Sequence, residues 1–287
     1  MRERAVSAAI FVPILIVALL LGGPWLAGLI LFAAGLASLE AMRLLRAAGY
    51  PVLVGLGVVL ALAIVADAAV PVDLAGSAAI LIAVAVILAA VGAFGRLDPK
   101  EGLATWVATV FGGVYVGMLG FILRLGNGAP DVSAGAPLGS TLDGARAWVI
   151  VLVLAVWAYD TGAYLIGKTF GQRFGEATGL TRFLTHLSPS KTYAGLFGGL
   201  AATTIVLAIG MWTLGAPPWH ALLVGPILGL AAQAGDLAES MLKRAAGRKE
   251  SGFLVPGHGG LLDRVDSFLF AAPVLAGYAL LIAGFGL

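Results

Sequence analysis

Cysteine is absent from this sequence, and charged residues make up only 11% of its 287 positions, against about a quarter in an ordinary soluble domain. The absence of cysteine excludes disulfide bonds and thiolate metal sites. Hydrophobic residues make up 60% of the chain, and the mean hydropathy is +1.02. A soluble fold has no interior large enough to bury so much apolar surface. We therefore predict an all-α, polytopic integral membrane protein.

Nine apolar segments approach the length of about 20 residues that an α-helix needs to cross a bilayer. Their hydrophobic runs are continuous rather than alternating, which favours helices over a β-barrel. The first segment has the basic start of a signal peptide but lacks a clear small-residue cleavage site, so we interpret it as a retained helix. The nine predicted spans are 5–21, 25–45, 52–66, 74–94, 103–124, 146–167, 193–214, 219–240 and 266–286.

The positions of the basic residues predict how these spans are oriented. With a cytoplasmic N-terminus, 15 of the 17 lysine and arginine residues lie on the inner side, and only Arg124 and Arg146 lie outside. Cytoplasmic loops of membrane proteins carry an excess of these residues. We therefore predict a multi-pass protein of the cell inner (plasma) membrane, with the N-terminus and the active site cytoplasmic and the C-terminus outside.

Residues 126–145 are rich in Gly, Pro, Ser and Ala and contain no cation, so we interpret them as an outer linker. This linker separates five N-terminal helices in 1–125 from a catalytic region in 146–287. The catalytic region has four helices and two cytoplasmic loops, 168–192 and 241–265. No internal repeat is visible, which weighs against a transporter built from repeated halves.

Small residues recur four positions apart in two of the predicted spans, at Gly113 with Gly117 and at Gly195 with Gly199. This spacing lets two helices approach each other closely. We favour packing within the bundle over a dimer contact as its cause.

The eighth span ends in a polar helix face that runs from the cytoplasmic end into the membrane. Asp236, Glu239, Ser240 and Lys243 follow one another at helical spacing, so they share one side of the helix. One interpretation is a buried ion pair between helices, and the other is a cation site with Asp236 as a ligand. Polar groups beside a bilayer are costly and hard cations such as Mg²⁺ take carboxylate oxygens, so we favour the cation site.

The loop after this span is rich in glycine and cations. Gly259 and Gly260 let the backbone approach a ligand, and consecutive N–H groups in such a loop bind anions. A loop that only sets the topology would also be basic, but it would have no use for the Gly-His-Gly-Gly run at 257–260. We expect His258 to bond to phosphate rather than to hold zinc. The candidate phosphate-binding cations here are Lys243, Arg244 and Lys249, of which Lys243 is also a candidate catalytic residue.

The segment LLDRVDSF at 261–268 opens the ninth span with two carboxylates. Acids at a helix start also suit the helix dipole, so capping is the alternative role for Asp263 and Asp266. Because they flank Arg264 and face Asp236 across a short loop, we favour catalytic roles for all four residues, with Asp236 and Asp263 as metal ligands.

The sixth span carries polar residues near its inner end. Asp160, Tyr164 and Lys168 share a helix face and are candidate substrate-binding residues. Residues 162–169, GAYLIGKT, match the phosphate-loop pattern formally. We reject that interpretation because the match lies inside an apolar helix and follows no strand.

The segment SPSKTYAG at 188–195 precedes the seventh span. Ser188 and Ser190 suit a helix N-cap, and Pro189 suits the first helical turn. Lys191 is the natural phosphate partner of this segment. We count Ser188 and Lys191 among the candidate substrate-binding residues.

These stretches together resemble a known family. SMLKRAAGRKESGFLVPGHGGLLDRVD at 240–266 resembles the signature of the phosphatidate cytidylyltransferases, also called CDP-diacylglycerol synthases. DTGAYLIGKTFG and SPSKTYAG are similar to stretches at the expected positions of that family. The resemblance covers about 146–287. Glu250 stands where the family usually has Asp, and Val255 where it usually has Leu, Ile or Phe.

The resemblance implies an all-helical membrane enzyme, usually a homodimer, that converts CTP and phosphatidate into CDP-diacylglycerol and pyrophosphate. It implies Mg²⁺ held by Asp236 and Asp263, and it allows a second, monovalent cation such as K⁺. No nucleic-acid partner is expected. Two alternatives stay open. A related lipid-phosphate nucleotidyltransferase or lipid kinase would use another substrate, and an ion-coupled transporter would explain the acids in the membrane but not the glycine-rich loop.

Overall fold

The computed structural model describes residues 2–70, 79–129, 137, 144–252 and 259–285. Within these ranges the chain forms α-helices and no β-strand, which confirms the all-α prediction. The helices are α1 Arg2–Leu21, α2 Gly23–Ala47, α3 Val54–Ala69, α4 Ala79–Ala93, α5 Pro99–Gly117, α6 Gly120–Gly128, α7 Gly144–Thr178, α8 Tyr193–Leu214, α9 Ala221–Ala245 and α10 Leu262–Phe285, with a short 3-10 helix at Pro218–His220.

In the described parts of the chain, helix length and hydropathy identify five helices that can cross a membrane: α2, α7, α8, α9 with the preceding 3-10 turn, and α10. A sixth span results if α5 and α6, which meet at an angle of 41°, are taken together. The apolar stretches of α1, α3 and α4 are shorter than 18 residues. Each of the nine predicted segments therefore contains helix, but the predicted count of nine spans is not confirmed.

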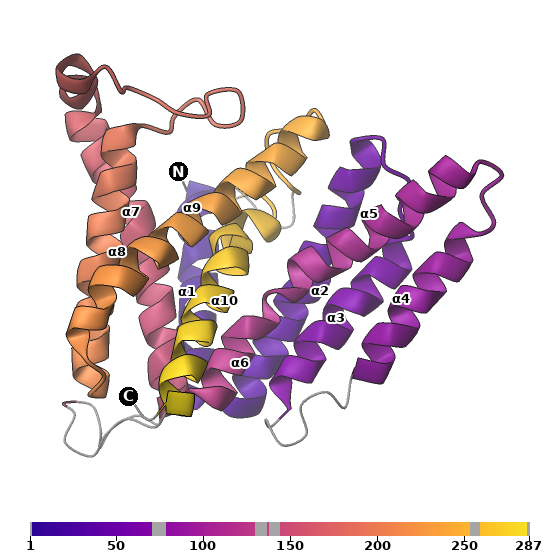
Figure 1. Cartoon of the computed structure of the whole chain (residues 1–287), viewed down its shortest axis with the longest axis horizontal. Coiled ribbons are helices and arrows are strands. Elements are labelled where there is room, and N and C mark those ends of the chain that lie inside the picture. The colour runs from indigo at the N-terminus through magenta and orange to yellow at the C-terminus, as the bar shows by residue number, and fades with distance from the viewer. Residues whose placement is uncertain (1, 71–78, 130–136, 138–143, 253–258, 286–287) are drawn as a thin grey trace.

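The helices form two groups with α9 and α10 between them, as Figure 1 shows. On one side lie α7 and α8, which pack against each other, and α8 also packs against α9. On the other side lie α2 to α5. The end of α7, the start of α8, the end of α9 and the start of α10 all lie at one end of the bundle. The polar residues of the two predicted cytoplasmic loops therefore face the same side.

The region between α7 and α8 differs from the sequence-based prediction. Helix α7 continues to Thr178, so the first part of the predicted loop 168–192 is helical. The N-cap of α8 is Thr192, whose side chain accepts a hydrogen bond from the Gly195 N–H. Ser188 and Ser190 are therefore not the caps of this helix. The run at 162–169 lies inside α7, which confirms that it is no phosphate loop.

Glycines allow close helix packing within the chain, as their spacing predicted. A side chain at Gly199 would overlap the ring of Tyr159 on α7, and one at Gly113 would overlap the backbone of Gly57 on α3. The small residues therefore serve the bundle itself. The predicted outer linker 126–145 lies mostly outside the described residues, and the division of the chain into two regions stays a prediction.

Candidate active site

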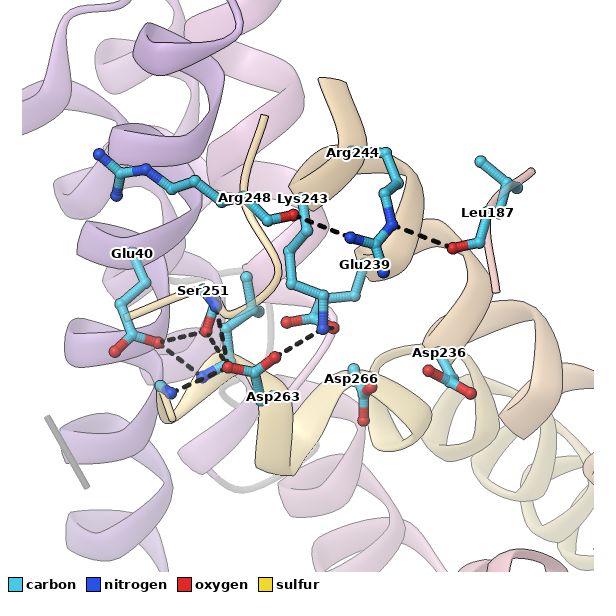
Figure 2. A network of polar contacts seen from close by, with 12 residues as sticks. Glu40, Leu187, Asp236, Glu239, Lys243, Arg244, Arg248, Ser251, Asp263 and Asp266 are labelled. Carbon is cyan, nitrogen blue, oxygen red and sulfur yellow. Dashed lines mark hydrogen bonds and ion pairs between the residues drawn. The ribbon is translucent and has the colours of Figure 1, made fainter. Parts of the chain in front are cut away.

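Three carboxylates converge between α9 and α10. Asp236, Glu239 and Asp266 each place one oxygen so that the three atoms lie within 4.8 Å of one another. Asp236 and Glu239 are three residues apart and share a face of α9, and Asp266 lies one turn into α10. Figure 2 shows the three side chains together beside Lys243.

The donor set of this group suits a hard divalent cation. Glu239 is completely buried, and among the described residues its oxygens have no partner apart from the ion pair with Lys243. Buried charges are normally paired or coordinate metals, and three clustered acids carry more negative charge than their two ion-paired lysines, Lys191 and Lys243, balance. Mg²⁺ takes oxygen ligands of this kind. Asp236, Glu239 and Asp266 therefore fit the cation that the sequence predicted.

Asp263 lies outside this group and has a different set of partners. Its Oδ2 atom accepts hydrogen bonds from the Ser251 N–H at 2.9 Å, the Ser251 hydroxyl at 2.7 Å and the Gly260 N–H at 2.9 Å. Its Oδ1 atom accepts one from Lys243 Nζ at 2.6 Å. The structure thus places Asp263 as an anchor of the loop before α10. Metal ligation by the pair Asp236 and Asp263 stays a prediction.

Lys243 joins the two sets of acids. Its ammonium group forms ion pairs with Glu239, one turn earlier on α9, and with Asp263 on α10. The side chain is only 12% exposed, so both pairs are shielded from water. Lys243 therefore links the C-terminal end of α9 to the N-terminal end of α10 beside the carboxylate group.

Glu40 ties the N-terminal helices to this site. It lies on α2 with 1% of its surface exposed, and its Oε2 atom accepts hydrogen bonds from the Leu262 N–H at 2.8 Å and the Ser251 hydroxyl at 3.2 Å. A side chain at Gly252 or Gly260 would overlap the Glu40 carboxylate. Glycine is therefore required at both positions for α2 to approach the loop.

Gly259 has a φ angle of 81°, a conformation that glycine adopts without strain. It lies beside the Asp263 carboxylate, which a side chain at this position would meet. Gly259 and Gly260 thus shape the start of α10, while the contact with a phosphate that their sequence pattern predicts stays a prediction. His258 lies outside the described residues.

Lys191 approaches the carboxylate group from the other side and forms an ion pair with Asp236. Hydrogen bonds across the loop hold its backbone, because the Phe183 N–H donates to the Lys191 carbonyl at 3.3 Å. Asp160 of α7 is close enough to Lys191 and Asp236 for their charges to interact. The structure therefore brings these three predicted site residues together.

Arg244 connects two loops at the same end of the bundle. Its Nε atom donates to the Leu187 carbonyl at 3.2 Å and its Nη1 atom to the Arg248 carbonyl at 3.3 Å (Figure 2). Ser188 lies in the turn next to Leu187, where its carbonyl accepts the Lys191 N–H. Lys249 is exposed beyond the end of α9. These contacts place Arg244 and Ser188 at the same end of the bundle as the carboxylate group, and their contact with substrate stays a prediction.

Two predicted residues form a pair of their own on the surface of α7. Lys168 Nζ donates to the Tyr164 hydroxyl at 3.4 Å and lies 5.5 Å from the centre of the Tyr164 ring. Both side chains are exposed. These contacts lie within one turn of α7, and the role of the pair in substrate binding stays a prediction.

Arg264 is placed apart from the carboxylate group. Successive helix residues are turned by about 100°, so Arg264 and Asp266 project from nearly opposite sides of α10. Arg264 lines a cavity between α10 and helices α1, α2 and α7. The sequence placed Arg264 beside the metal, whereas the structure places it on the other side of α10.

Sequence reasoning missed several residues of this site. Glu40 carries the clearest signal, because it is a lone acid inside an apolar run and such residues are expensive in a membrane. Ser251 has no comparable signal. The Tyr159 hydroxyl donates to the Gln233 Oε1 atom at 2.8 Å and joins α7 to α9 below the carboxylates. Only the three-dimensional arrangement shows these contacts.

Comparison with known proteins places the chain among enzymes of one kind. The family model described as "Cytidylyltransferase family" matches residues 2–282. A phosphatidate cytidylyltransferase of Synechocystis sp. is 32% identical over 304 residues, which cover 98% of this chain and 97% of that relative. Proteins of the same name from Staphylococcus epidermidis and Staphylococcus aureus are 41% and 42% identical over 130 residues, about 45% of this chain and 47% of theirs. The chain belongs to the cytidylyltransferase family.

Proposed function

We propose that this protein transfers CMP from CTP to phosphatidate and releases CDP-diacylglycerol and pyrophosphate, the reaction that the names of its relatives describe. The convergence of the Asp236, Glu239 and Asp266 carboxylates between two helices of a membrane bundle carries the proposal. A lipid phosphate and a water-soluble nucleotide can meet only at the surface of the membrane. The protein is a multi-pass membrane protein, and the enzyme is a nucleotidyltransferase of phospholipid synthesis.

The chemistry asks for positioning and for neutralisation of charge. A phosphate oxygen of phosphatidate attacks the α-phosphorus of CTP, and the bond from that phosphorus to pyrophosphate breaks. The nucleophile is already an anion, so no covalent enzyme intermediate is required. Catalysis then depends on orienting two anions and stabilising the charge that develops on the leaving group.

The cations around the acids suit this task. Lys243 and Lys191 reach the carboxylate group from opposite sides, and either one can exchange a carboxylate for a phosphate oxygen. Arg244 braces the surrounding loops through two backbone carbonyls. Removal of Lys243 is therefore expected to weaken the use of CTP.

Asp236, Glu239 and Asp266 would hold the Mg²⁺ ion, and Asp263 lies outside this group. A bound Mg²⁺ ion polarises phosphoryl oxygens and stabilises a departing pyrophosphate. The second, monovalent cation implied by the family resemblance stays a prediction. So do the homodimer, the cell inner membrane as the location, and the orientation with the N-terminus and the active site cytoplasmic.

The direct test incubates the purified protein with labelled CTP, phosphatidate and Mg²⁺, and follows labelled CDP-lipid and pyrophosphate. We expect both products in equal amounts. Competition with other lipid phosphates distinguishes phosphatidate from the substrates of related lipid-phosphate enzymes. Absence of any nucleotide transfer, together with ion-dependent uptake in vesicles, would instead support the transporter alternative.

A further inference from the structure

An apolar cavity of about 310 Å³ lies between α1, α2, α7 and α10, on the far side of α10 from the carboxylate group. Its walls are aliphatic and aromatic, and Arg264 is the one charged residue among the described residues that line it. Its volume lies at the lower end of the range for ligand pockets, about 300–1,000 Å³. Representative lining residues are Leu15, Ile30, Ala33, Val153 and Phe268.

One stripe of α10 faces this cavity. Leu261, just before the helix, and Arg264, Val265 and Phe268 follow at spacings of three and four residues and all line it. Asp266 is turned by about 200° from Arg264 and belongs to the carboxylate group. The start of α10 therefore presents a cation to the cavity and a carboxylate to the opposite side, at nearly the same level along the helix.

The cavity extends from the polar end of the bundle into the apolar region. Arg264 lies in the first turn of α10, beside the loops that carry the site. Leu19 and Leu26, which also line the cavity, flank the turn between α1 and α2. That turn lies near the start of α7, where Arg146 donates to the Leu20 carbonyl at 3.0 Å. Asp160 lies about 20 Å further along α7.

We infer that this cavity holds an acyl chain of the phosphatidate substrate, with the lipid phosphate at Arg264. The inference rests on the proposed function. A cavity that is apolar along its length and cationic at its polar end complements a lipid with an anionic headgroup. The planar guanidinium group binds phosphate through paired N–H donors. A phosphate held there lies at the same end of α10 as Asp266, where the reaction with CTP takes place.

A second apolar cavity, of about 740 Å³, lies between α4, α5, α9 and α10, and it supplies a control. None of the described residues that line it is charged. It therefore accommodates hydrocarbon of any lipid but offers no ionic partner to a phosphate. Val107 on α5 lines this second cavity and takes no part in the polar site.

Photo-crosslinking locates the lipid without any turnover. The full-length protein in vesicles of phosphatidylcholine is irradiated, in the absence of CTP, with phosphatidate that carries a diazirine in one acyl chain. We expect adducts on peptides of α1, α2 and α7, reduced by excess unlabelled phosphatidate but not by excess phosphatidylcholine. Adducts confined to α5 and α9, or adducts that phosphatidylcholine displaces equally well, would overturn the inference.

Kinetics of four variants test the cationic end of the cavity and its apolar part separately. Arg264→Gln is expected to raise the KM for phosphatidate about ten- to a hundredfold with little change in the KM for CTP, and Arg264→Lys to recover part of the loss. Ala33→Phe narrows the cavity and should act on the same KM, whereas Val107→Phe should not. A rise in the KM for CTP alone in Arg264→Gln would assign Arg264 to the nucleotide and contradict the inference.

The outcomes separate this inference from the proposed function. If the unaltered protein makes no CDP-lipid, the proposed function fails, whatever the adducts show. If it makes CDP-diacylglycerol while the adducts map to the second cavity, the function stands and the lipid position is wrong. Because crosslinking uses the unaltered chain, a variant that fails to fold does not prevent the decision.

Discussion

Glu40 and Ser251 lie 211 positions apart in the sequence, yet the Ser251 hydroxyl is 3.2 Å from the Glu40 Oε2 atom in a buried site. The same hydroxyl is 2.7 Å from the Asp263 Oδ2 atom. A hydroxyl group has one proton to donate, so Ser251 serves one carboxylate at a time. Glu40 thereby connects helix α2 both to Ser251 and to the Leu262 N–H at the start of α10.

The first prediction concerns Glu40 as a positioning residue. Glu40→Ala removes the acceptor of the Leu262 N–H, and an unsatisfied buried donor costs about 1–3 kcal/mol. We expect a lower melting temperature and a lower kcat, with faster hydrogen exchange in the described residues 259–262. Glu40→Gln keeps an oxygen acceptor and should recover most of the loss. The matched control is Ser38→Ala on the same helix, because the Ser38 hydroxyl donates to the Gly35 carbonyl of its own helix at 2.9 Å. Equal losses in Glu40→Gln and Glu40→Ala would contradict the positioning role.

The second prediction concerns Lys243, which neutralises two acids. Lys243→Met leaves Glu239 and Asp263 without their shared cation, and breaking a buried ion pair costs about 3–5 kcal/mol. We expect a large fall in the free energy of unfolding and a weakened use of CTP. Adding Glu239→Gln to Lys243→Met should restore part of the stability but not the activity. A double-mutant cycle on unfolding in detergent measures the coupling, and strictly additive effects would show that the pair is not coupled.

The third prediction separates Asp236 from Asp263. Asp236 is a proposed metal ligand, so Asp236→Asn should abolish turnover. Because its carboxylate lies within 4.8 Å of two others that repel it, the same change should leave the stability unchanged or raise it. Asp263 accepts four hydrogen bonds, so Asp263→Asn should lower both stability and activity. Thermal unfolding in the absence of divalent cations, measured beside turnover, distinguishes the two. A stable but inactive Asp263→Asn variant would favour the pair Asp236 and Asp263 as metal ligands.

The fourth prediction concerns the metal dependence of turnover. Removal of divalent cations with a chelator should abolish CDP-lipid formation, and added Mg²⁺ should restore it. Glu239→Gln should raise the Mg²⁺ concentration needed for half-maximal rate, because it removes a buried carboxylate ligand. Ser240→Ala, on the neighbouring position of α9, is the comparison. A Mg²⁺ requirement that stays the same in Glu239→Gln would remove Glu239 from the metal site.

Much of the fold could be predicted from hydropathy, because continuous apolar runs in a membrane protein can only be helices. The number of spans could not, since α3 and α4 are apolar but shorter than a span and α5 bends into α6. The polar face of α9 was predictable from its helical spacing, which grouped Asp236, Glu239 and Lys243, although Glu239 was not predicted as a metal ligand. The spacing of these residues along α9 indicated that they share one helix face, but it could not show which residues of other helices lie near them.

Contacts between distant segments explain what the sequence could not show. Asp263 and Asp266 look equivalent as two acids three positions apart, yet Lys243 of α9, Ser251 and Gly260 donate hydrogen bonds to Asp263. Arg264 sits between them in the sequence but projects toward α1 and α2. Ser188 was assigned as a cap because serine suits that position, but the chain begins α8 later, at Thr192. These differences arise from tertiary packing, which sequence spacing does not encode.

The position of a bound divalent ion tests the account most directly. A crystal of the protein soaked with Mn²⁺ in place of Mg²⁺ gives an anomalous signal that locates the ion independently of the protein atoms. We expect the ion within about 2.5 Å of oxygens from Asp236, Glu239 and Asp266. An ion bound by Asp263 without Glu239, or carboxylates of α9 and α10 that lie far apart and bind no ion, would contradict the account.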